Sequence, residues 1–338
     1  MDYRPLGRTG VQVSKLCLGS MMFGAWGNTD HDDSIRIIHR ALDAGVNFVD
    51  TADVYSAGES EEIVGKALRG RRDDVVLATK FFMPMGEDPN RRGGSRRWIV
   101  QSVEDSLRRL QTDRIDLYQV HRPDPAVDVE ETLGALTDLV RQGKVRYIGS
   151  SSYPGSEIVE AQWTARERRL ERFRTEQPPY SLLNRSIELD VLPTAQRHGM
   201  GILTYSPLAG GWLSGSWSAD SSPTSPARQR LAARFDMDLP ENQLKLQAVE
   251  QLAKVAADAG LTMIELAIAF VVNHPAVTSA IIGPRTMEQL ESQLPAAGAT
   301  LDAAVLDRID EIVKPGVNLN PADTSYGEQV LDPALRRR

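Results

Sequence analysis

The sequence predicts a single α/β domain folded as a (β/α)8 TIM barrel, a closed ring of eight parallel strands with helices around it. Two observations predict this fold. Short apolar runs rich in Val, Ile and Leu recur along the 338 residues, and segments with the apolar spacing of amphipathic helices separate them. In addition, no G-x-G-x-x-G follows the first run, because Gly19–Gly24 does not fit that spacing, so an open doubly wound sheet is the weaker alternative.

The predicted elements follow one another in a regular order. A small β-hairpin over residues 3–14, with Gly7 and Gly10 in its turn, precedes the repeat. The eight predicted strands are Lys15–Gly19, Val46–Asp50, Val75–Lys80, Ile115–Val120, Val145–Gly149, Phe173–Gln177, Gly201–Tyr205 and Ser279–Ile282. The predicted helices are Ser34–Ala44, Ser60–Leu68, Trp98–Leu110, Val129–Gln142, Ser156–Arg169, Ile187–His198, Gln243–Ala259, Ile264–Val272, Met287–Leu294 and Ala303–Val313. A glycine follows several of these helices, as is typical of helix C-termini.

Three segments interrupt this rhythm. Phe82–Arg97 is rich in Gly, Pro and Arg, and Ser206–Asn242 contains the low-complexity stretch SGSWSADSSPTSP. Both follow strands, so we expect long loops on the rim where barrel active sites lie, with a disordered insertion as the alternative. Residues 315–338 are expected to form a C-terminal tail, which leaves one domain over residues 1–338.

Composition and charge disfavour several classes of function. The net charge is −7, from 46 acidic and 39 basic residues, and no long block of like charge suggests a nucleic-acid groove or a basic membrane face. Cys17 is the only cysteine, so the chain forms no internal disulfide and a reducing compartment fits. The N-terminus MDYRPLGRTG lacks an apolar signal core, and no apolar stretch approaches the ~18 residues of a membrane span. We therefore expect a soluble cytoplasmic protein.

Four polar side chains stand at or just beyond the ends of predicted strands: Asp50, Tyr55, Lys80 and His121. Because the carboxyl ends of parallel strands meet on one rim, they predict a proton-transfer site. The phenol of Tyr55, with a pKa of about 10, can deliver its proton to an alkoxide that develops on a carbonyl oxygen. Lys80 would favour the phenolate that is left, and Asp50 would orient the ammonium of Lys80. His121 would donate an N–H to the carbonyl oxygen. The structural alternative is an ion pair of Asp50 and Lys80, with Tyr55 packed in a loop and His121 in the core.

No metal site is predicted. His31, His39, His198 and His274 fall mainly on predicted helices or loops and form no HxH or HExxH pattern. A metal-dependent barrel hydrolase, which needs clustered histidine and carboxylate ligands, is therefore disfavoured.

Three motifs resemble the catalytic signatures of the aldo-keto reductase superfamily: Asp50-Thr-Ala-Asp-Val-Tyr55, Ala78-Thr-Lys80 and Ile115-Asp-Leu-Tyr-Gln-Val-His121. The resemblance covers nearly the whole chain, from Leu6-Gly-Arg-Thr-Gly10 to Ile281-Ile-Gly283. It implies a barrel that uses NADPH, sometimes NADH, to reduce aldehydes and ketones without a metal. It also implies Tyr55 as the proton donor, Lys80 and Asp50 as the groups that tune it, and His121 as the group that orients the carbonyl.

The resemblance further implies a set of residues that bind the NADPH cofactor. Those expected around the nicotinamide are Gly19, Ser20, Met21, Asp50, Ser151, Gln177 and Tyr205. Those expected along the pyrophosphate and at the adenosine end are Ser206, Leu208, Gly210, Leu213, Gly283, Arg285, Gln289 and Gln293. Ser152 is also expected to bind the cofactor, and it stands where the family has an asparagine. Because serine is shorter, a bridging water would take over one of the contacts to the carboxamide. Gln293 stands at another position that is more usually asparagine.

Arg285 is predicted to bind the adenosine 2′-phosphate. It stands just after the last predicted strand and before the helix Met287–Leu294, where a helix N-terminus favours an anion and a guanidinium can make a forked contact to phosphate oxygens. The alternative is that Arg285 stacks on adenine or pairs with Glu288. The sequence therefore predicts a preference for NADPH over NADH.

The substrate pocket and a second class of function stay open at this stage. Candidates to line an apolar pocket are Met22, Phe23, Trp26, Phe81, Phe82 and Trp212, with Arg122 at its edge, and each is equally compatible with ordinary packing. Some members of the superfamily, such as the β subunits of potassium channels, keep the barrel and the cofactor but act mainly as partner-binding, redox-sensing modules. A small carbonyl compound is the predicted partner, whereas the physiological substrate, the reaction direction and the oligomeric state are not predicted.

Overall fold

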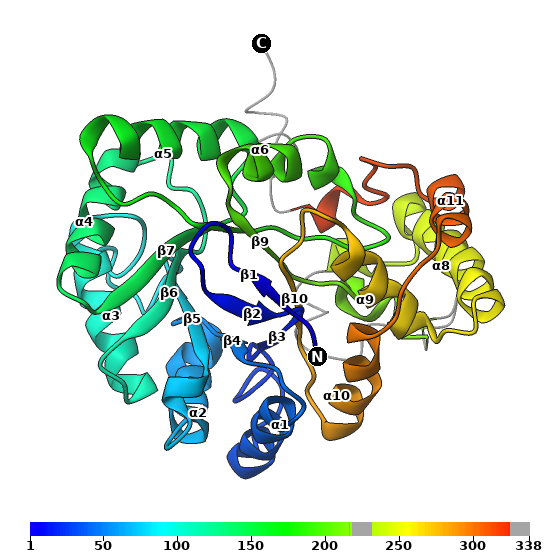
Figure 1. The fold of residues 1–338 in the computed structure, drawn as a ribbon, viewed down its shortest axis with the longest axis horizontal. Helices are drawn as coiled ribbons and strands as arrows, with labels where there is room; N and C mark the ends of the chain where they lie inside the picture. Colours follow the sequence, from blue (N-terminus) through cyan, green and yellow to red (C-terminus); the bar gives the residue numbers. More distant parts are fainter. Residues whose placement is uncertain (216, 218–231, 325–338) are drawn as a thin grey trace.

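The computed structural model describes residues 1–215, 217 and 232–324. In this part of the chain eight parallel strands close into a barrel in the order β10-β3-β4-β5-β6-β7-β8-β9, which confirms the predicted fold class (Figure 1). The barrel strands are β3 (Leu16–Gly19), β4 (Phe48–Asp50), β5 (Val76–Phe81), β6 (Ile115–Val120), β7 (Val145–Ser151), β8 (Thr175–Gln177), β9 (Gly201–Thr204) and β10 (Ser279–Ile282). The ring has no free edge, so every strand is paired on both sides.

All eight predicted strands are present, and the ends of six of them differ from the prediction by one or two residues. β6 and β10 match the prediction to the residue. β4 and β8 begin two residues later than predicted, whereas β5 and β7 extend to Phe81 and Ser151. The strands are buried on both faces because helices cover the outside of the barrel, and for this reason their apolar runs are continuous in the sequence.

Helices surround the barrel in Figure 1. In the described residues they are α1 (His31–Asp43), α2 (Glu59–Ala67), α3 (Arg96–Leu110), α4 (Val129–Arg141), α5 (Gly155–Arg168), α6 (Val191–His198), α8 (Pro240–Asp258), α9 (Met263–Asn273), α10 (Met287–Gln293) and α11 (Ala303–Ile312). Several begin at a side chain that satisfies a free backbone N–H. Asp30 accepts from the N–H of Asp33 at the start of α1, and Thr262 forms a capping box with Glu265 at the start of α9.

The helix predicted over Ile187–His198 is wrong in its first part. The structure has one short turn at Ser186–Glu188 and then α6, which begins at Val191. Between them Asp190 leaves the helical region, with φ −135° and ψ −60°. Pro193 explains the break. It lacks an N–H, and its ring would clash with the carbonyl four residues upstream, so a helix accommodates it only in the first turn.

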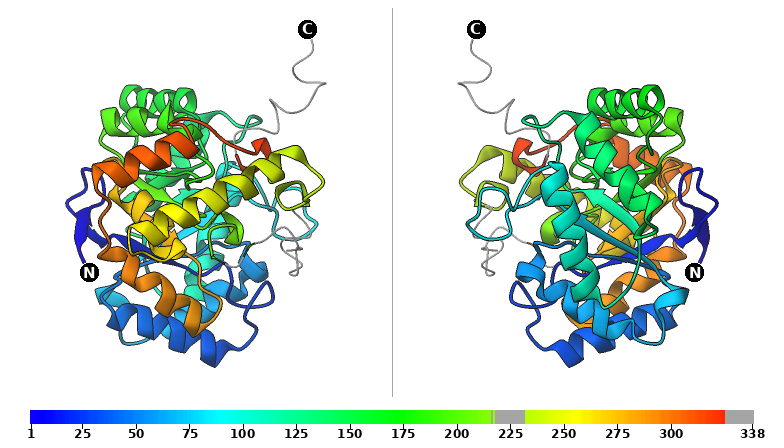
Figure 2. Two further views of the ribbon diagram at one scale, coloured as in Figure 1. Left: turned by 90° about the vertical axis from the view of Figure 1, so that its right-hand side faces the viewer. Right: turned by 90° about the vertical axis from the view of Figure 1, so that its left-hand side faces the viewer.

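A two-stranded hairpin covers the end of the barrel at which the strands begin. β1 (Tyr3–Pro5) and β2 (Gln12–Ser14) pair in antiparallel fashion, and Figure 1 looks onto them. Gly7 in the turn has φ +55°, and a Cβ there would lie 2.6 Å from the backbone N of Gly201, so only glycine permits this approach to β9. Figure 2 shows the hairpin on one side of the molecule and the loop between β5 and α3 on the opposite side. The end where the strands finish is therefore left to the long loops.

The C-terminal segment packs against the barrel as far as the structure describes it. The backbone N–H of Leu319 donates to the carbonyl of Leu183 at 3.1 Å, and the buried Asn320 donates to Oδ1 of Asn242 on α8 at 2.7 Å. Of the tail predicted over 315–338, residues 325–338 lie outside the described residues, as do residues 216 and 218–231 of the second long loop with most of its low-complexity stretch.

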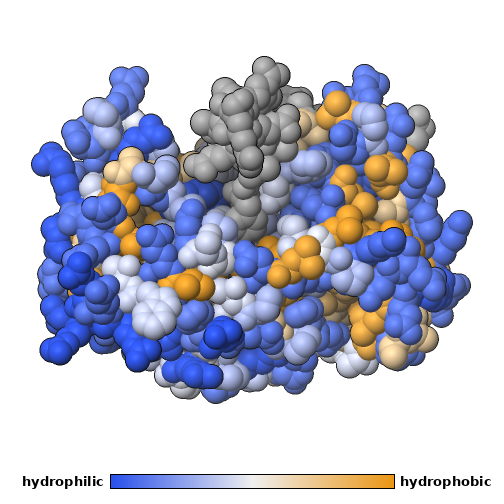
Figure 3. Space-filling view, turned by 90° about the horizontal axis from the view of Figure 1, so that it is seen from above, coloured by the Kyte–Doolittle hydropathy of each residue, from blue (hydrophilic) through white to orange (hydrophobic). Residues whose placement is uncertain are grey.

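Within residues 1–215, 217 and 232–324, no single helix has both the length and the hydropathy needed to cross a bilayer. Helices α8 and α9 reach that length and hydropathy only when taken together, and the pair is bent by 90°. On the face drawn in Figure 3 hydrophilic residues predominate and hydrophobic ones form separate patches.

Candidate active site

The alternation of side chains along the strands brings polar groups into the barrel at its carboxyl end. The apolar cluster inside the barrel includes Cys17, Phe48, Ala78 and Leu117. Because strand residues two positions apart face the same side, the next inward residues on these strands are Gly19, Asp50, Lys80 and Gln119. The three polar residues among them are at most 2% exposed as whole residues. A buried polar layer therefore lies directly above the apolar layer of the barrel.

The ammonium of Lys80 has an acceptor for each of its three protons. Nζ lies 2.5 Å from Oδ1 of Asp50, 2.9 Å from the carbonyl O of Thr51 and 3.3 Å from the phenol oxygen of Tyr55. Burial is the largest influence and disfavours the charged form, but Asp50 and Tyr55 together outweigh it, and the pKa of Lys80 is raised. Lys80 therefore stays a cation in contact with the phenol.

The second carboxylate oxygen of Asp50 accepts hydrogen bonds from two buried amides. Nε2 of Gln177 lies 2.9 Å away and Nε2 of Gln119 lies 3.2 Å away. The sequence analysis missed Gln119, although a polar amide inside the apolar run Ile115–His121 was a usable signal. Gln177, which was expected to contact a cofactor, holds the carboxylate in this structure. Both oxygens of Asp50 are thus occupied, so the carboxylate is fixed toward Lys80.

Tyr55 begins a turn whose backbone is strained. In the turn Tyr55–Gly58, Ser56 has φ 49° and Ala57 has φ 57°, which are left-handed values that cost non-glycine residues about 1–3 kcal/mol each. Burial raises the pKa of Tyr55, and the nearby ammonium of Lys80 opposes this rise without reversing it. The lowering expected from Lys80 is therefore present but outweighed, and the phenol holds its proton at neutral pH.

The imidazole of His121 completes the group. It meets the ring of Tyr55 edge-on, with centroids 5.9 Å apart and an interplanar angle of 81°. Burial, together with the charges of Lys80 and Arg122, holds the pKa of His121 well below its ordinary value. The ring is therefore neutral at pH 7 and carries one N–H to donate. Its Nδ1 is buried without a hydrogen-bond partner among the described residues.

Arg122 connects the histidine to the opposite wall of the site. Its Nη1 donates to the carbonyl of His121 at 2.9 Å and to Oγ of Ser152 at 2.6 Å. The same Oγ lies 3.2 Å from the phenol oxygen of Tyr205. Ser152 has φ 59°, a left-handed conformation in which asparagine is enriched and serine is not. The hydroxyl of Ser152 thus joins two predicted site residues that are far apart in the sequence.

The residues expected around the nicotinamide fall into two groups. Ser151 is buried beside Gln177, with its Oγ donating to the Gln177 carbonyl at 2.9 Å. Ser20 is buried too, and its backbone N–H donates to the carbonyl of Asp50 at 2.9 Å. Met21, by contrast, is 45% exposed. The first group lines the buried layer around Asp50, and Met21 lies on the surface above it.

The rim loop after β9 presents two of the four residues expected along a pyrophosphate. Ser206 and Gly210 are exposed. Leu213 is fully buried in the core, and its backbone N–H already donates to the carbonyl of Leu208 at 3.2 Å. In this structure the backbone N–H of Leu213 is therefore used within the loop.

The residues expected at the adenosine end lie around the start of α10. Arg285 is exposed, and its guanidinium has no hydrogen bond or ion pair within the described residues, including none to Glu288. Its backbone N–H donates to Oε1 of Gln289 at 2.7 Å. Gln293 is 5% exposed, and its Oε1 is buried with no partner among the described residues. Gly283 is exposed just after β10.

Three of the residues suggested for an apolar pocket belong to packed regions instead. Phe23, Phe81 and Trp212 are 0% exposed, so they line no open surface. Phe81 packs against the ring of Tyr118 with centroids 4.9 Å apart, and the ring centroid of Trp212 lies 4.5 Å from Nζ of Lys245. These three assignments are corrected, because their aromatic surface is already covered by neighbouring side chains.

The remaining apolar pocket candidates, Met22, Trp26 and Phe82, keep some exposed surface. Trp26 is 39% exposed, and its ring centroid lies 6.0 Å from that of Tyr55. Met22 and Phe82 are half-buried. Trp26 is therefore the aromatic side chain best placed to contact a molecule bound at Tyr55.

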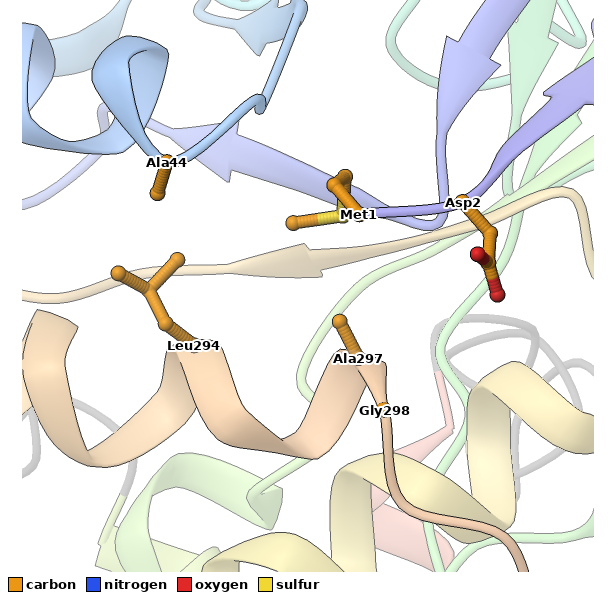
Figure 4. Close-up of a pocket in the computed structure, with 6 residues that line it drawn as sticks. All are labelled: Met1, Asp2, Ala44, Leu294, Ala297 and Gly298. Atoms are coloured by element: carbon orange, nitrogen blue, oxygen red, sulfur yellow. The ribbon is translucent and has the colours of Figure 1, made fainter.

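The hollow drawn in Figure 4 is separate from this site. It is lined by Met1, Asp2, Ala44, Leu294, Ala297 and Gly298, beside the N-terminus. The carboxylate of Asp2 points away from the apolar side chains of Ala44 and Leu294 in this view and pairs with Lys15 at 2.7 Å. We assign no chemistry to it. In the part of the chain that the structure describes, no three His, Cys, Asp or Glu residues are grouped so as to hold a metal ion.

A closed parallel barrel with acid–base side chains gathered at its carboxyl end is the arrangement of (β/α)8-barrel enzymes. The sequence model of the aldo/keto reductase family matches residues 15–314, and the chain belongs to this family of oxidoreductases. It is 43% identical to the "Uncharacterized oxidoreductase YrpG" of Bacillus subtilis (strain 168), over 92% of this chain and 96% of that protein. It is 36% identical to the "Aldo-keto reductase YhdN" of the same organism, over 99% of each chain. It is also 36% identical to a "Probable voltage-gated potassium channel subunit beta" of Oryza sativa subsp. japonica, over 93% of this chain and 97% of that protein.

Proposed function

We propose that this chain catalyses the NADPH-dependent reduction of aldehydes or ketones to alcohols, with Tyr55 as the proton donor. One observation carries the proposal: the buried ammonium of Lys80 contacts both the carboxylate of Asp50 and the phenol of Tyr55. A cation in that position lowers the free energy of the phenolate that remains after the phenol gives up its proton. The contact therefore favours proton transfer from Tyr55 to an oxygen on which negative charge develops.

Each side chain then has one role. NADPH, when bound, supplies the hydride that reduces the carbonyl carbon. Tyr55 donates its proton to the carbonyl oxygen, and Lys80 stabilises the phenolate that is left. The neutral imidazole of His121 donates an N–H to the same oxygen and so orients the carbonyl. Asp50 keeps Lys80 charged and in place.

The residues present fit the proposed cofactor. Oε1 of Gln293 is buried without a partner among the described residues, and the guanidinium of Arg285 is likewise unengaged there, so both are available to the polar groups of a ligand. The amide N–H groups of Gln177 and the hydroxyl proton of Ser151 are donated within the structure, so these two buried residues would meet a carboxamide at the other end through their side-chain oxygens, as acceptors. The charge of Arg285 favours a ligand with an adenosine 2′-phosphate, and therefore NADPH over NADH.

A second candidate function is a cofactor-binding, partner-binding module similar to the β subunits of potassium channels. The observation that favours it is the 36% identity to proteins of rice and of Arabidopsis thaliana that carry the name of a probable channel subunit β. The reductase is the first choice because all four acid–base groups are present and in contact range. For the reductase we further propose a small carbonyl compound as the partner, no nucleic-acid or membrane partner, and a cytoplasmic location.

Steady-state oxidation of NADPH against a panel of aldehydes, ketones and sugars separates the two functions. The reductase is expected to turn over at least one class of carbonyl compound repeatedly, with saturation by both substrate and cofactor. Tight NADPH binding without repeated turnover on any member of the panel would instead favour the binding module.

A further inference from the structure

A second cluster of polar groups lies behind the turn that carries Tyr55, and the proposed proton transfer does not use it. The cluster consists of Asp53, Glu61, Ser102, Arg109 and Tyr118. Four of these side chains, all except that of Arg109, are at most 1% exposed. Buried polar groups that are remote from solvent need partners for every charge they carry. The balance of charges in this cluster is therefore informative.

Glu61 and Arg109 form a compensated ion pair. Oε2 of Glu61 accepts from Nε of Arg109 at 2.7 Å, and Oε1 accepts from the hydroxyl of Thr79 at 2.6 Å. Although burial disfavours the guanidinium, the charge of Glu61 raises the pKa of Arg109. Taken together, the pair carries no net charge.

Asp53 has no cation of its own. Its Oδ2 accepts from the hydroxyl of Ser102 at 3.1 Å, and its Oδ1 is buried without a partner among the described residues. Burial, and then the negative charge of Glu61, raise the pKa of Asp53 to about 8. One cation faces two carboxyl groups, so the cluster is balanced only while Asp53 is neutral.

Both ends of the Tyr55 turn touch this cluster. Asp53 precedes Tyr55 by two residues, and its backbone N–H donates to the carbonyl of Lys80 at 3.1 Å. Gly58 ends the turn with φ +101°, and a Cβ there would lie 2.7 Å from Cδ of Arg109. The strained residues Ser56 and Ala57 lie between these two contacts. The cluster is therefore the support on which the turn is held.

We propose that neutral Asp53 is a positioning residue for Tyr55: with the Glu61–Arg109 pair it holds the strained turn in the place from which the phenol reaches Lys80. Ionisation of Asp53 adds a second negative charge beside Glu61, so we expect the turn to move and proton transfer to slow. The groups that face Asp53 are Glu61 on α2, Ser102 and Arg109 on α3 and Tyr118 on β6. Burial holds the pKa of Tyr118 well above its ordinary value, so this phenol stays neutral throughout.

The test compares pH profiles of kcat for NADPH and 4-nitrobenzaldehyde, and for this readout it rests on the proposed reductase function. Asp53→Asn keeps the shape of a neutral carboxyl group and cannot ionise. In the wild type we expect kcat to decrease as the pH rises, with a midpoint near the Asp53 pKa of about 8. The Asp53→Asn variant should keep its kcat at neutral pH and lack this decline, with an unchanged Kd for NADPH.

Glu176→Gln is the matched control. Glu176 is also fully buried, and burial raises its pKa to about 8. It accepts from Ser150 at 2.5 Å and from the backbone N–H of Tyr153 at 3.0 Å, on β7 and the loop after it rather than at the Tyr55 turn. The alkaline decline is expected to persist in this variant. Persistence of the decline in Asp53→Asn, or its loss in Glu176→Gln alone, would overturn the proposal.

Thermal unfolding gives a readout that does not depend on activity. Because the folded-state pKa of Asp53 is raised above the ordinary value of 3.8, the folded protein binds the extra proton between pH ~4 and 8. The contribution of Asp53 to stability therefore falls as pH rises through that window. The Tm of Asp53→Asn relative to wild type should therefore increase from pH 5 to about 8 and then level off. A Tm difference independent of pH would contradict the inference, whereas a wild type without any carbonyl turnover would contradict the proposed function instead.

If Asp53→Asn does not fold, Ser102→Ala replaces it, and loss of the hydrogen bond that Ser102 donates to Asp53 should move the alkaline decline of kcat to higher pH.

Discussion

Lys80 and Asp50 form a buried ion pair, with Nζ and Oδ1 2.5 Å apart and side chains 0% and 3% exposed. Such a pair is weak evidence for chemistry on its own, because buried ion pairs also serve structure. What distinguishes this one is the third partner, the phenol of Tyr55, at 3.3 Å from the same ammonium. The structural and the chemical roles can be separated by removing the pair as a unit.

Removal of Lys80 alone should harm both stability and catalysis. Lys80→Met leaves the carboxylate of Asp50 buried without a cation, which is expected to cost about 3–5 kcal/mol in the free energy of unfolding. Loss of the cation beside the phenol should also lower kcat by about 10²-fold or more. The double variant Asp50→Asn with Lys80→Met removes both charges, so we expect urea denaturation to show most of the stability recovered while kcat stays low. Recovery of kcat in the double variant would show that the pair is only structural.

Arg285→Ala tests the choice of cofactor. The guanidinium is unengaged within the described residues, and a charged hydrogen bond to a 2′-phosphate is worth roughly 1.5–3 kcal/mol, about ten- to a hundred-fold in affinity. We therefore expect the wild type to prefer NADPH and the variant to bind NADPH at least about ten-fold more weakly, with little change for NADH. Fluorescence titration with both cofactors measures this. Equal losses for NADPH and NADH would show that Arg285 does not contact the phosphate, and Arg285→Lys is the control that keeps the charge.

Arg122 is expected to favour substrates that carry a carboxylate. Its Nη1 is held by the His121 carbonyl and by Ser152, and in the described residues its guanidinium has no carboxylate partner. Arg122→Met should therefore lower kcat/KM for 4-carboxybenzaldehyde by about ten-fold or more, while 4-nitrobenzaldehyde, which carries no net charge, is affected less. The ratio of the two kcat/KM values is the measurement. A ratio that does not change on substitution would exclude this role.

Metal removal is expected to have no effect. The acid–base groups proposed here need no Lewis acid, because Lys80 supplies the positive charge next to Tyr55. Dialysis against EDTA should therefore leave NADPH-dependent turnover unchanged. Loss of activity on chelation, with recovery on addition of zinc or magnesium, would require a different chemistry.

The sequence was sufficient for the fold and for the gathering of Asp50, Tyr55, Lys80 and His121 at one end of the barrel, because both depend on strand patterns. Parallel strands end on one rim, and alternation along each strand then decides that Asp50 and Lys80 face inward together. The same rule would have found Gln119, which shares the inward register but was hidden inside an apolar run. A different signal, Pro193, marked the break before α6, because proline is accommodated only in the first turn of a helix.

Contacts between distant segments could not be predicted in the same way. Ser152 meets Arg122 and Tyr205 only because the barrel closes, and no spacing in the sequence encodes these distances. Apolar residues beside a polar site also have the same pattern whether they line a pocket or fill the core. For this reason the sequence left Phe23 and Phe81 open between pocket lining and ordinary packing, and the structure buries both completely.

The proton donor itself gives the most direct test of the account. Tyr55→Phe removes the hydroxyl that contacts Lys80 and leaves the ring in place, so we expect kcat for NADPH-dependent reduction of 4-nitrobenzaldehyde to fall by about 10² to 10⁴ or more, the usual size of a general-acid contribution. The Kd for NADPH should change little, because the residues proposed to bind it are untouched. A variant with kcat close to that of the wild type would contradict the central claim that Tyr55 delivers the proton.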